Sequence, residues 1–230
     1  DGFVGMVDTQ RTGPVWRLLL AGAALIALRF ASAGAGIPPS PWDAYNEGVR
    51  AYAAGQYAAA FDCWHDLALE PLPRQLRSSV WFQLGNAQFR LGEPLEADAP
   101  EQAVEWWRRA LESYRAALER RPGHSGARHN FDLVRRRLAR VLHQLAIEAL
   151  DAAQKQPLDP AIGLLNDGLT KAEEAVLWHP EDASMRVGLE RIESALKERW
   201  IERAAGSETK GDLEAGRNTG WGDLEAEARY

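Results

Sequence analysis

The sequence predicts an all-α fold built from repeated helical hairpins. Two stretches share one pattern, in which two glycines lie seven residues apart: Gly48 and Gly55 in the first stretch, Gly85 and Gly92 in the second. In both stretches a small residue then precedes an aromatic residue by four positions, and a proline follows. Alanine, leucine, glutamate and arginine are abundant and β-branched runs are few, which favours helix over strand.

The first hairpin is expected to comprise helices at residues 42–54 and 57–69. Gly55 separates them, because glycine adopts a left-handed backbone angle at little cost. Gly48 and Ala60 are expected where the two helices approach closely. The space around this contact is expected to be filled by aromatic side chains, namely Tyr52, Tyr57, Phe61 and Trp64.

The second hairpin opens with a helix predicted at residues 77–91. In a regular repeat the next small packing residue follows the second glycine by five positions, but here Ala110 follows Gly92 by eighteen. The difference is an insertion of thirteen residues. We expect residues 93–100 to form a loop and residues 101–107 to lengthen the second helix at its N-terminal end.

A long third helix is predicted after the second hairpin, because apolar residues recur at helical spacing over about 30 residues. Its apolar stripe comprises Phe131, Val134, Leu138, Val141, Leu142, Leu145 and Ala149. Pro157 and Pro160 are expected to end this helix.

Two further helices complete the predicted domain, which spans residues 42–204. The first is a partner for the long helix, with small residues and a proline at repeat-like spacing: Gly168, Ala172, Ala175 and Pro180. The last is predicted at residues 181–204, with an apolar face made of Met185, Leu189, Ile192, Leu196 and Trp200. We interpret it as a C-terminal capping helix, which covers the apolar surface at the open end of a stack.

The N-terminal residues 1–33 have the order of a secretory signal peptide. Two arginines, Arg11 and Arg17, precede an apolar run at residues 18–28, and a small-x-small site ends at Ala33. Eleven apolar residues in a helix span about 16 Å, against about 30 Å of bilayer hydrocarbon. Cleavage after Ala33 is the first interpretation, and an uncleaved membrane anchor or a plain soluble helix are the alternatives.

The segments that flank the predicted domain have biased compositions. Residues 34–41 form a proline-rich linker, and Met6 is an alternative start that would leave residues 1–5 upstream. Residues 205–230 are rich in glycine and acidic residues, which predicts a disordered acidic tail. The motif Gly-Asp-Leu-Glu-Ala occurs twice in this tail, at residues 211–215 and 222–226. A solvated tail is the first interpretation, and a docking peptide for another protein, including the lone aromatic Trp221, is the second.

The glycine, small-residue and aromatic spacings resemble the tetratricopeptide repeat (TPR) family over about 160 residues. Residues 84–92 and 127–134 are similar to the TPR proteins of bacterial Bat-type (aerotolerance) operons. The resemblance to those proteins implies a bacterial envelope location and association with von Willebrand-type domain proteins and a MoxR-type ATPase. The wider family implies a right-handed α-solenoid whose concave face, lined by the first helix of each pair, holds a peptide or helix of another protein.

The sequence contains no arrangement of residues that suggests catalysis, and we expect a protein that is not an enzyme. No two of the five histidines lie four residues apart, no phosphate-binding glycine loop is present, and we expect neither a metal nor a cofactor. Cys63 is the single cysteine, so no intramolecular disulfide can form. The net charge of −6 gives no reason to expect nucleic acid as a partner.

Candidate partner-binding residues lie on the first helices of the pairs and on the third helix. The inward-facing set comprises Tyr45, Asn46, Val49, Tyr52, Phe82, Asn86, Phe89, Arg90, His129 and Asn130. The asparagines could bond the backbone of an extended ligand, while the aromatics form pockets; the alternative is that half of the set packs between units. Residues 101–140 hold ten arginines and five acidic residues. Arg136 and Arg140 are therefore candidates for an acidic partner segment or anionic lipid heads, with a solvated face as the alternative.

These observations predict a non-enzymatic adaptor or scaffold of the bacterial envelope that binds another protein in its concave groove. The predicted location is periplasmic or secreted, or anchored in the inner membrane and facing the periplasm if the N-terminal segment is retained. The alternative function is structural, with self-assembly through the long third helix and the last apolar face.

Overall fold

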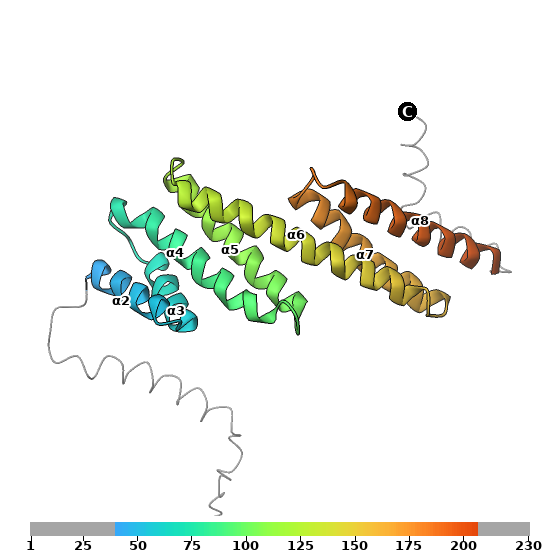
Figure 1. Ribbon diagram of the computed structural model, residues 1–230, viewed down its shortest axis with the longest axis horizontal. Coiled ribbons are helices and arrows are strands. Elements are labelled where there is room, and N and C mark those ends of the chain that lie inside the picture. The colour runs from blue at the N-terminus through green and yellow to red at the C-terminus, as the bar shows by residue number, and fades with distance from the viewer. Residues whose placement is uncertain (1–39, 207–230) are drawn as a thin grey trace, which may run out of the picture. The chain divides into compact units, whose positions relative to one another are not determined.

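The computed structural model describes residues 40–206, which are all-α with no β-strand among them (Figure 1). Every described helix belongs to one unit of the chain, Pro41–Tyr230. The helices are α2 (Pro41–Ala53), α3 (Tyr57–Leu69), α4 (Arg74–Gly92), a short 3-10 helix η1 (Glu93–Leu95), α5 (Pro100–Arg120), α6 (Ser125–Ala153), α7 (Leu158–Trp178) and α8 (Ala183–Gly206). The predicted signal peptide and nearly all of the predicted linker and tail lie outside the described residues.

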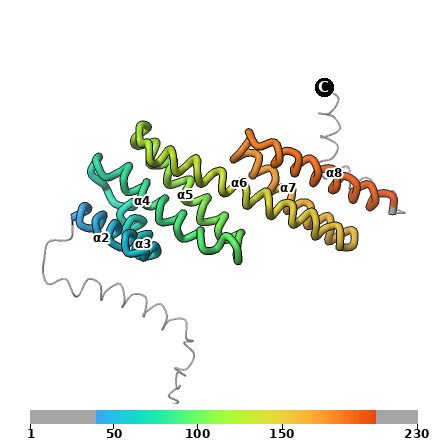
Figure 2. Tube along the Cα trace, in the orientation of Figure 1, coloured from blue at the N-terminus to red at the C-terminus, as the bar shows by residue number. Residues whose placement is uncertain are grey.

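Each helix packs against the helix that follows it in the chain. In addition, α2 contacts α4, α4 contacts α6 and α6 contacts α8, so the first helices of successive pairs lie next to one another. Figure 2 shows the chain passing from pair to pair in sequence order. Most contacts are therefore made between neighbouring helices. The buried side chains form three groups, one along α2–α4, one centred on α5 and α6 that also includes Ala175 and Met185, and one along α6–α8.

Two tryptophans pack against glycines in the same way, which we call the tryptophan–glycine contact. A Cβ atom added to Gly48 would lie 2.5 Å from Nε1 of Trp64, and one added to Gly92 would lie 2.6 Å from Nε1 of Trp107. Each indole N–H donates to the carbonyl three residues before the glycine, Trp64 to Tyr45 and Trp107 to Phe89, both at 3.3 Å. Both tryptophans are completely buried. Only a residue without a Cβ leaves room for the indole at this distance.

The predicted insertion lies between α4 and α5. Gly85 packs against Tyr114, twenty-nine positions later, whereas Gly48 packs against Trp64, sixteen positions later. The difference is the thirteen residues that the sequence predicted. They form η1, a turn, and the N-terminal part of α5, which confirms the lengthened helix and places Trp107 over Gly92.

The observed helix boundaries correct three details of the prediction. First, α4 begins at Arg74, three residues earlier than predicted, directly after Pro73 at its N-cap. Pro160 does not end α6, because it lies in the first turn of α7, where the missing proline N–H has no helical partner to lose. Finally, α8 begins at Ala183, where the side chain of Asp182 accepts a hydrogen bond from the backbone N–H of Ser184 at 2.9 Å.

Candidate functional site

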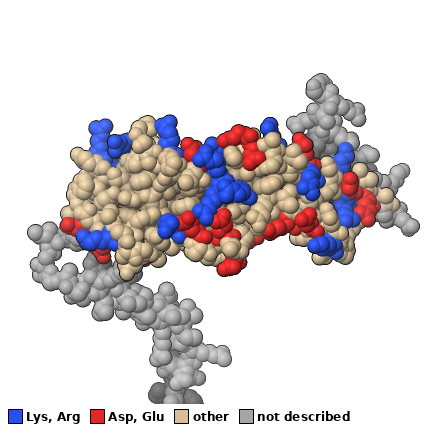
Figure 3. All heavy atoms as spheres, in the orientation of Figure 1, with Lys and Arg blue, Asp and Glu red and all other residues tan. Residues whose placement is uncertain are grey.

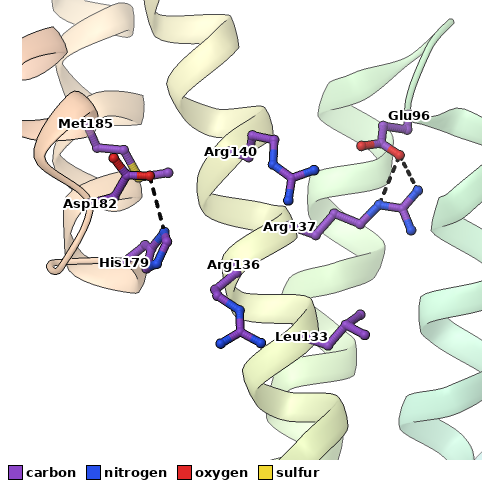
Figure 4. A pocket seen from close by; sticks show the side chains of 8 residues that line it. All are labelled: Glu96, Leu133, Arg136, Arg137, Arg140, His179, Asp182 and Met185. Carbon is purple, nitrogen blue, oxygen red and sulfur yellow. Dashed lines mark hydrogen bonds and ion pairs between the residues drawn. The ribbon is translucent and has the colours of Figure 1, made fainter.

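A pocket of ≈ 630 Å³ lies where α6 meets the turn between α7 and α8 and the segment that follows η1 (Figure 4). We call it the arginine pocket, and its lining is Glu96, Leu133, Arg136, Arg137, Arg140, His179, Asp182 and Met185. Figure 3 shows a cluster of basic side chains over the middle of α6 with acidic side chains beside it. All three arginines belong to α6. Arg140 follows Arg136 by four residues and Arg137 by three, and residues at these spacings lie on the same side of a helix.

Arg137 lines the pocket, but its side chain is held by residues of other elements. Arg137 donates to Glu93 Oε1 at 2.9 Å and from Nε to Glu96 Oε2 at 3.0 Å. Its guanidinium also lies over the rings of Phe89 and Trp107, with the carbon Cζ 5.5 and 5.1 Å from the ring centroids. Of the interactions that raise the pKa of Arg137, the hydrogen bond to Glu96 is the largest. Arg137 therefore fastens α6 to the insertion and offers little to a ligand.

Arg135 is engaged on the other side of α6. It donates to the backbone oxygen of Trp178 at 2.7 Å, to Asp132 at 3.0 Å and to Glu181 at 3.1 Å. Arg135 and Arg137 thus each bridge α6 to another element, whereas Arg136 between them does not.

Arg136 and Arg140 are exposed and have no hydrogen-bond or ion-pair partner among residues 40–206. Figure 4 shows Arg137 turned toward Glu96, and Arg136 and Arg140 lying between that pair and the turn that carries His179 and Asp182. Leu133, one turn before Arg136, is 40% exposed. Two cations beside an exposed apolar side chain are suited to a ligand that carries carboxylates around an apolar group.

The acidic residues that line the pocket are already satisfied. Glu96 is paired with Arg137, and Asp182 accepts hydrogen bonds from the N–H and, at 2.6 Å, from the hydroxyl of Ser184. Those hydrogen bonds lower the pKa of Asp182, so its carboxylate stays ionised at neutral pH. His179 Nδ1 lies 3.7 Å from Asp182 Oδ2. The lining therefore contains three arginines against two carboxylates, and the unpaired charge is positive.

Two of the predicted asparagines are half-buried and hydrogen-bonded to other side chains of the protein. Asn86 Oδ1 accepts hydrogen bonds from the hydroxyl of Tyr114 at 2.9 Å and from Asn130 Nδ2 at 2.8 Å. Asn86 Nδ2 in turn donates to Gln83 Oε1 at 2.7 Å. Burial raises the pKa of the Tyr114 hydroxyl well above its ordinary value, so it remains a donor. These amides link α4, α5 and α6, which agrees with the alternative that part of the set packs between units.

The predicted aromatic residues also make internal contacts. Tyr45 and Tyr52 lie against the ring of Trp64, with centroids 6.4 and 5.8 Å apart. Phe82 lies between Tyr114 and His124, and Phe89 lies beside Trp107. Arg90 donates to the hydroxyl of Tyr57 at 2.7 Å and to Glu93 at 2.6 Å. These residues are half-buried and position the helices.

The remaining predicted residues are exposed, namely Asn46, Val49 and His129. Trp42 lies one turn before Asn46 on α2 and is 46% exposed, although we did not predict it as a binding residue. Leu133 was missed in the same way. For Leu133 the signal was present in the sequence, because it is a large apolar residue outside the apolar stripe predicted for the third helix.

Among residues 40–206 no group of three or more histidine, cysteine or carboxylate side chains is placed to hold a metal ion. Cys63 is half-buried on α3. None of the helices described between Pro41 and Gly206 combines the length and apolar character needed to span a bilayer. No protein-family model matches this chain, and no curated protein is significantly similar to it.

Proposed function

We propose that this protein is a non-enzymatic binding scaffold of the TPR type, and that the arginine pocket is a principal part of its binding surface. The observation that carries the proposal is the pair of exposed arginines, Arg136 and Arg140, which have no partner among the described residues and lie beside exposed Leu133. Arginine guanidinium groups bind carboxylates in a bidentate geometry, which suits a partner segment that carries acidic side chains.

The helix packing supports the TPR-type arrangement. Paired helices follow one another, and the first helices of the pairs contact each other, as stacked helical hairpins require. Gly48 and Gly85 each lie under an aromatic ring of the second helix of their pair, and this shared contact supports a repeated hairpin. A right-handed solenoid would align α2, α4 and α6 along one face, with Trp42, Val49 and Leu133 exposed on them.

The proposed partner is another protein of the bacterial envelope, and von Willebrand-type domain proteins are the candidates that the resemblance suggests. The proposed setting is periplasmic or secreted, or membrane-anchored if the N-terminal segment is retained. Self-assembly is the second candidate function. The observation that favours it is the set of exposed apolar side chains on the last two helices, Leu177 at 75%, Val187 at 54% and Ile201 at 59%.

The test is photo-crosslinking of the full chain, with p-benzoylphenylalanine in place of Leu133, in an envelope extract of the producing organism. We expect adducts with one or a few proteins, and about a tenfold lower yield in the double variant Arg136→Glu, Arg140→Glu. The matched control is Arg115→Glu, Arg191→Glu, which changes two exposed arginines outside the pocket by the same charge. Adducts with the mass of two copies of the chain would support self-assembly. No adduct, or adducts that both double variants lose equally, would contradict the proposal.

A further inference from the structure

The arginine pocket has a candidate ligand within the same chain. The C-terminal segment contains Gly-Asp-Leu-Glu-Ala twice, at residues 211–215 and 222–226. In each copy, two carboxylates flank one leucine. The pocket offers the complementary set, two arginines on one face of α6 that have no partner among residues 40–206 and the exposed apolar side chain of Leu133. We propose that the second copy, with Asp223, Leu224 and Glu225, docks in the arginine pocket of its own chain.

The length of α8 decides which copy of the Gly-Asp-Leu-Glu-Ala motif can reach the arginine pocket. The pocket includes Met185 in the first turn of α8, and α8 ends at Gly206. At 1.5 Å per residue these positions are about 32 Å apart. Asp212 follows Gly206 by six residues, which span at most about 21 Å when fully extended. Asp223 follows by seventeen residues, which can span about 58 Å. The second copy can therefore reach the pocket of the same molecule with both of its carboxylates, whereas Asp212 of the first copy falls short of it.

The affinity that this docking requires is modest. A segment tethered to its own site is present at an effective concentration on the order of 1 mM. A contact with a Kd of about 1 mM in the separated pieces would therefore be formed about half of the time. Two exposed arginine–carboxylate pairs are individually weak, but the leucine between them adds apolar burial. The contact is also expected to weaken with salt, because both pairs are near the surface.

Docking of this segment would place it where the proposed partner binds. The inference does not depend on that partner, because it concerns contacts within one chain. If both proposals hold, a partner must displace the segment, and removal of residues 207–230 should increase partner capture at Leu133. The segment would then act as an internal competitor that limits binding to partners with stronger acidic motifs.

The experiment uses the purified full chain with p-benzoylphenylalanine in place of Leu133, irradiated without any other protein and digested with trypsin. Cleavage after Lys210, Arg217 and Arg229 separates the two copies, since residues 211–217 hold the first and residues 218–229 hold the second. We expect the crosslink on residues 218–229, in a species with the mass of one chain. Its yield should fall about tenfold in Asp223→Asn, Glu225→Gln and in Arg136→Gln, Arg140→Gln.

The first copy supplies the matched control, because Asp212→Asn, Glu214→Gln makes the same chemical change in a copy that cannot bring both carboxylates to the pocket. This variant should crosslink like the parent chain. Mixing ¹⁵N-labelled and unlabelled chains distinguishes the same molecule from a second copy. A crosslink on residues 211–217, an isotopically mixed crosslink, equal loss in the control, or no crosslink in a chain with an intact helical circular-dichroism signal would overturn the proposal. Because no partner is present, none of these results depends on the outcome of the test in the envelope extract.

Discussion

The contacts that join α2 to α3 and α4 to α5 differ from the contact that joins α6 to α7. In the first two, a glycine on the earlier helix lies under a ring of the later one, as with Gly48 under Trp64 and Gly92 under Trp107. In the third, the glycine is on the later helix, and a Cβ at Gly168 would lie 3.1 Å from the Cβ of Ala149 and 3.2 Å from the carbonyl oxygen of Ala146. In each of the first two pairs a rigid buried ring thus lies between the two helices. In the third pair the two helix backbones approach each other directly.

The difference teaches that one repeat pattern can be satisfied by two kinds of packing. A ring in a glycine notch contributes a large buried area and a hydrogen bond, so the contact depends on one side chain. A glycine against alanines contributes many small contacts, so no single side chain dominates. Substitutions should therefore have concentrated effects in α2–α5 and distributed effects in α6–α7.

The largest expected effect is that of Trp107→Ala. The side chain is fully buried among α4, α5 and α6, and its removal should lower the free energy of unfolding by about 3–5 kcal/mol. Urea unfolding followed by far-ultraviolet circular dichroism measures this loss. Trp42→Ala removes an indole that is 46% exposed and should change stability by about 0.5 kcal/mol or less. Equal losses in the two variants would refute the assignment of Trp107 as the central contact.

A smaller effect is expected when each glycine is replaced by alanine. Gly92→Ala places a methyl group 2.6 Å from Nε1 of a buried ring, and the overpacking cost of about 1–3 kcal/mol should exceed the helix-propensity gain of about 1 kcal/mol. Gly168→Ala meets small neighbours at 3.1 Å or more, so the gain should offset most of the cost. Thermal unfolding of both variants shows which substitution lowers the stability more. A larger loss for Gly168→Ala would show that the third pair is the less tolerant one.

The smallest expected effect concerns the start of α6, where the two regions meet. His124 Nδ1 accepts a hydrogen bond from the Ala127 N–H at 3.1 Å, and its ring lies 4.6 Å from that of Phe82. Burial first, and the charge of Arg121 second, lower the pKa of His124 below its ordinary value of 6.5. The unfolded chain therefore binds the proton more readily, and stability should fall as the pH drops below 6.5 toward the lower folded value.

Loss of this N-cap should remove about 1 kcal/mol of unfolding free energy between pH 7 and pH 5. The matched variant is His124→Asn, because asparagine is a good N-cap acceptor that does not titrate. Urea unfolding of the parent chain and of His124→Asn, each at pH 7 and pH 5, measures the change in the free energy of unfolding. The pH-dependent loss should be smaller in His124→Asn than in the parent chain, and identical losses would assign the effect to other groups.

Much of the fold could be predicted from the sequence, since most contacts are local. Glycine and proline positions predicted the breaks, and the observed ends of α4 and α8 lie within three residues of those expected. The positive φ of 74° at Gly55 confirms the predicted left-handed turn. The contact of Trp107 with Gly92 was missed, because that glycine also fits the role of a turn residue and the insertion that brings the tryptophan to it has no counterpart in the first hairpin.

The candidate site was less predictable, because its arrangement depends on residues distant in the sequence. Arg136 and Arg140 were predicted as binding residues, but the sequence does not reveal that Arg137 pairs with Glu96, forty-one positions earlier. In the same way, Asn86 and Asn130 are forty-four positions apart and bond each other. Helical periodicity assigns a residue to a face, whereas its partner is determined by how neighbouring helices stack.

The thirteen inserted residues serve the interior and the surface together. They place the indole of Trp107 against Gly92, and they carry Glu96, which lines the arginine pocket and pairs with Arg137. A shortened version of this hairpin would lose both features in a single step. The length of this one connection therefore links the packing of α4 against α5 to the shape of the arginine pocket, so a deletion here would change both.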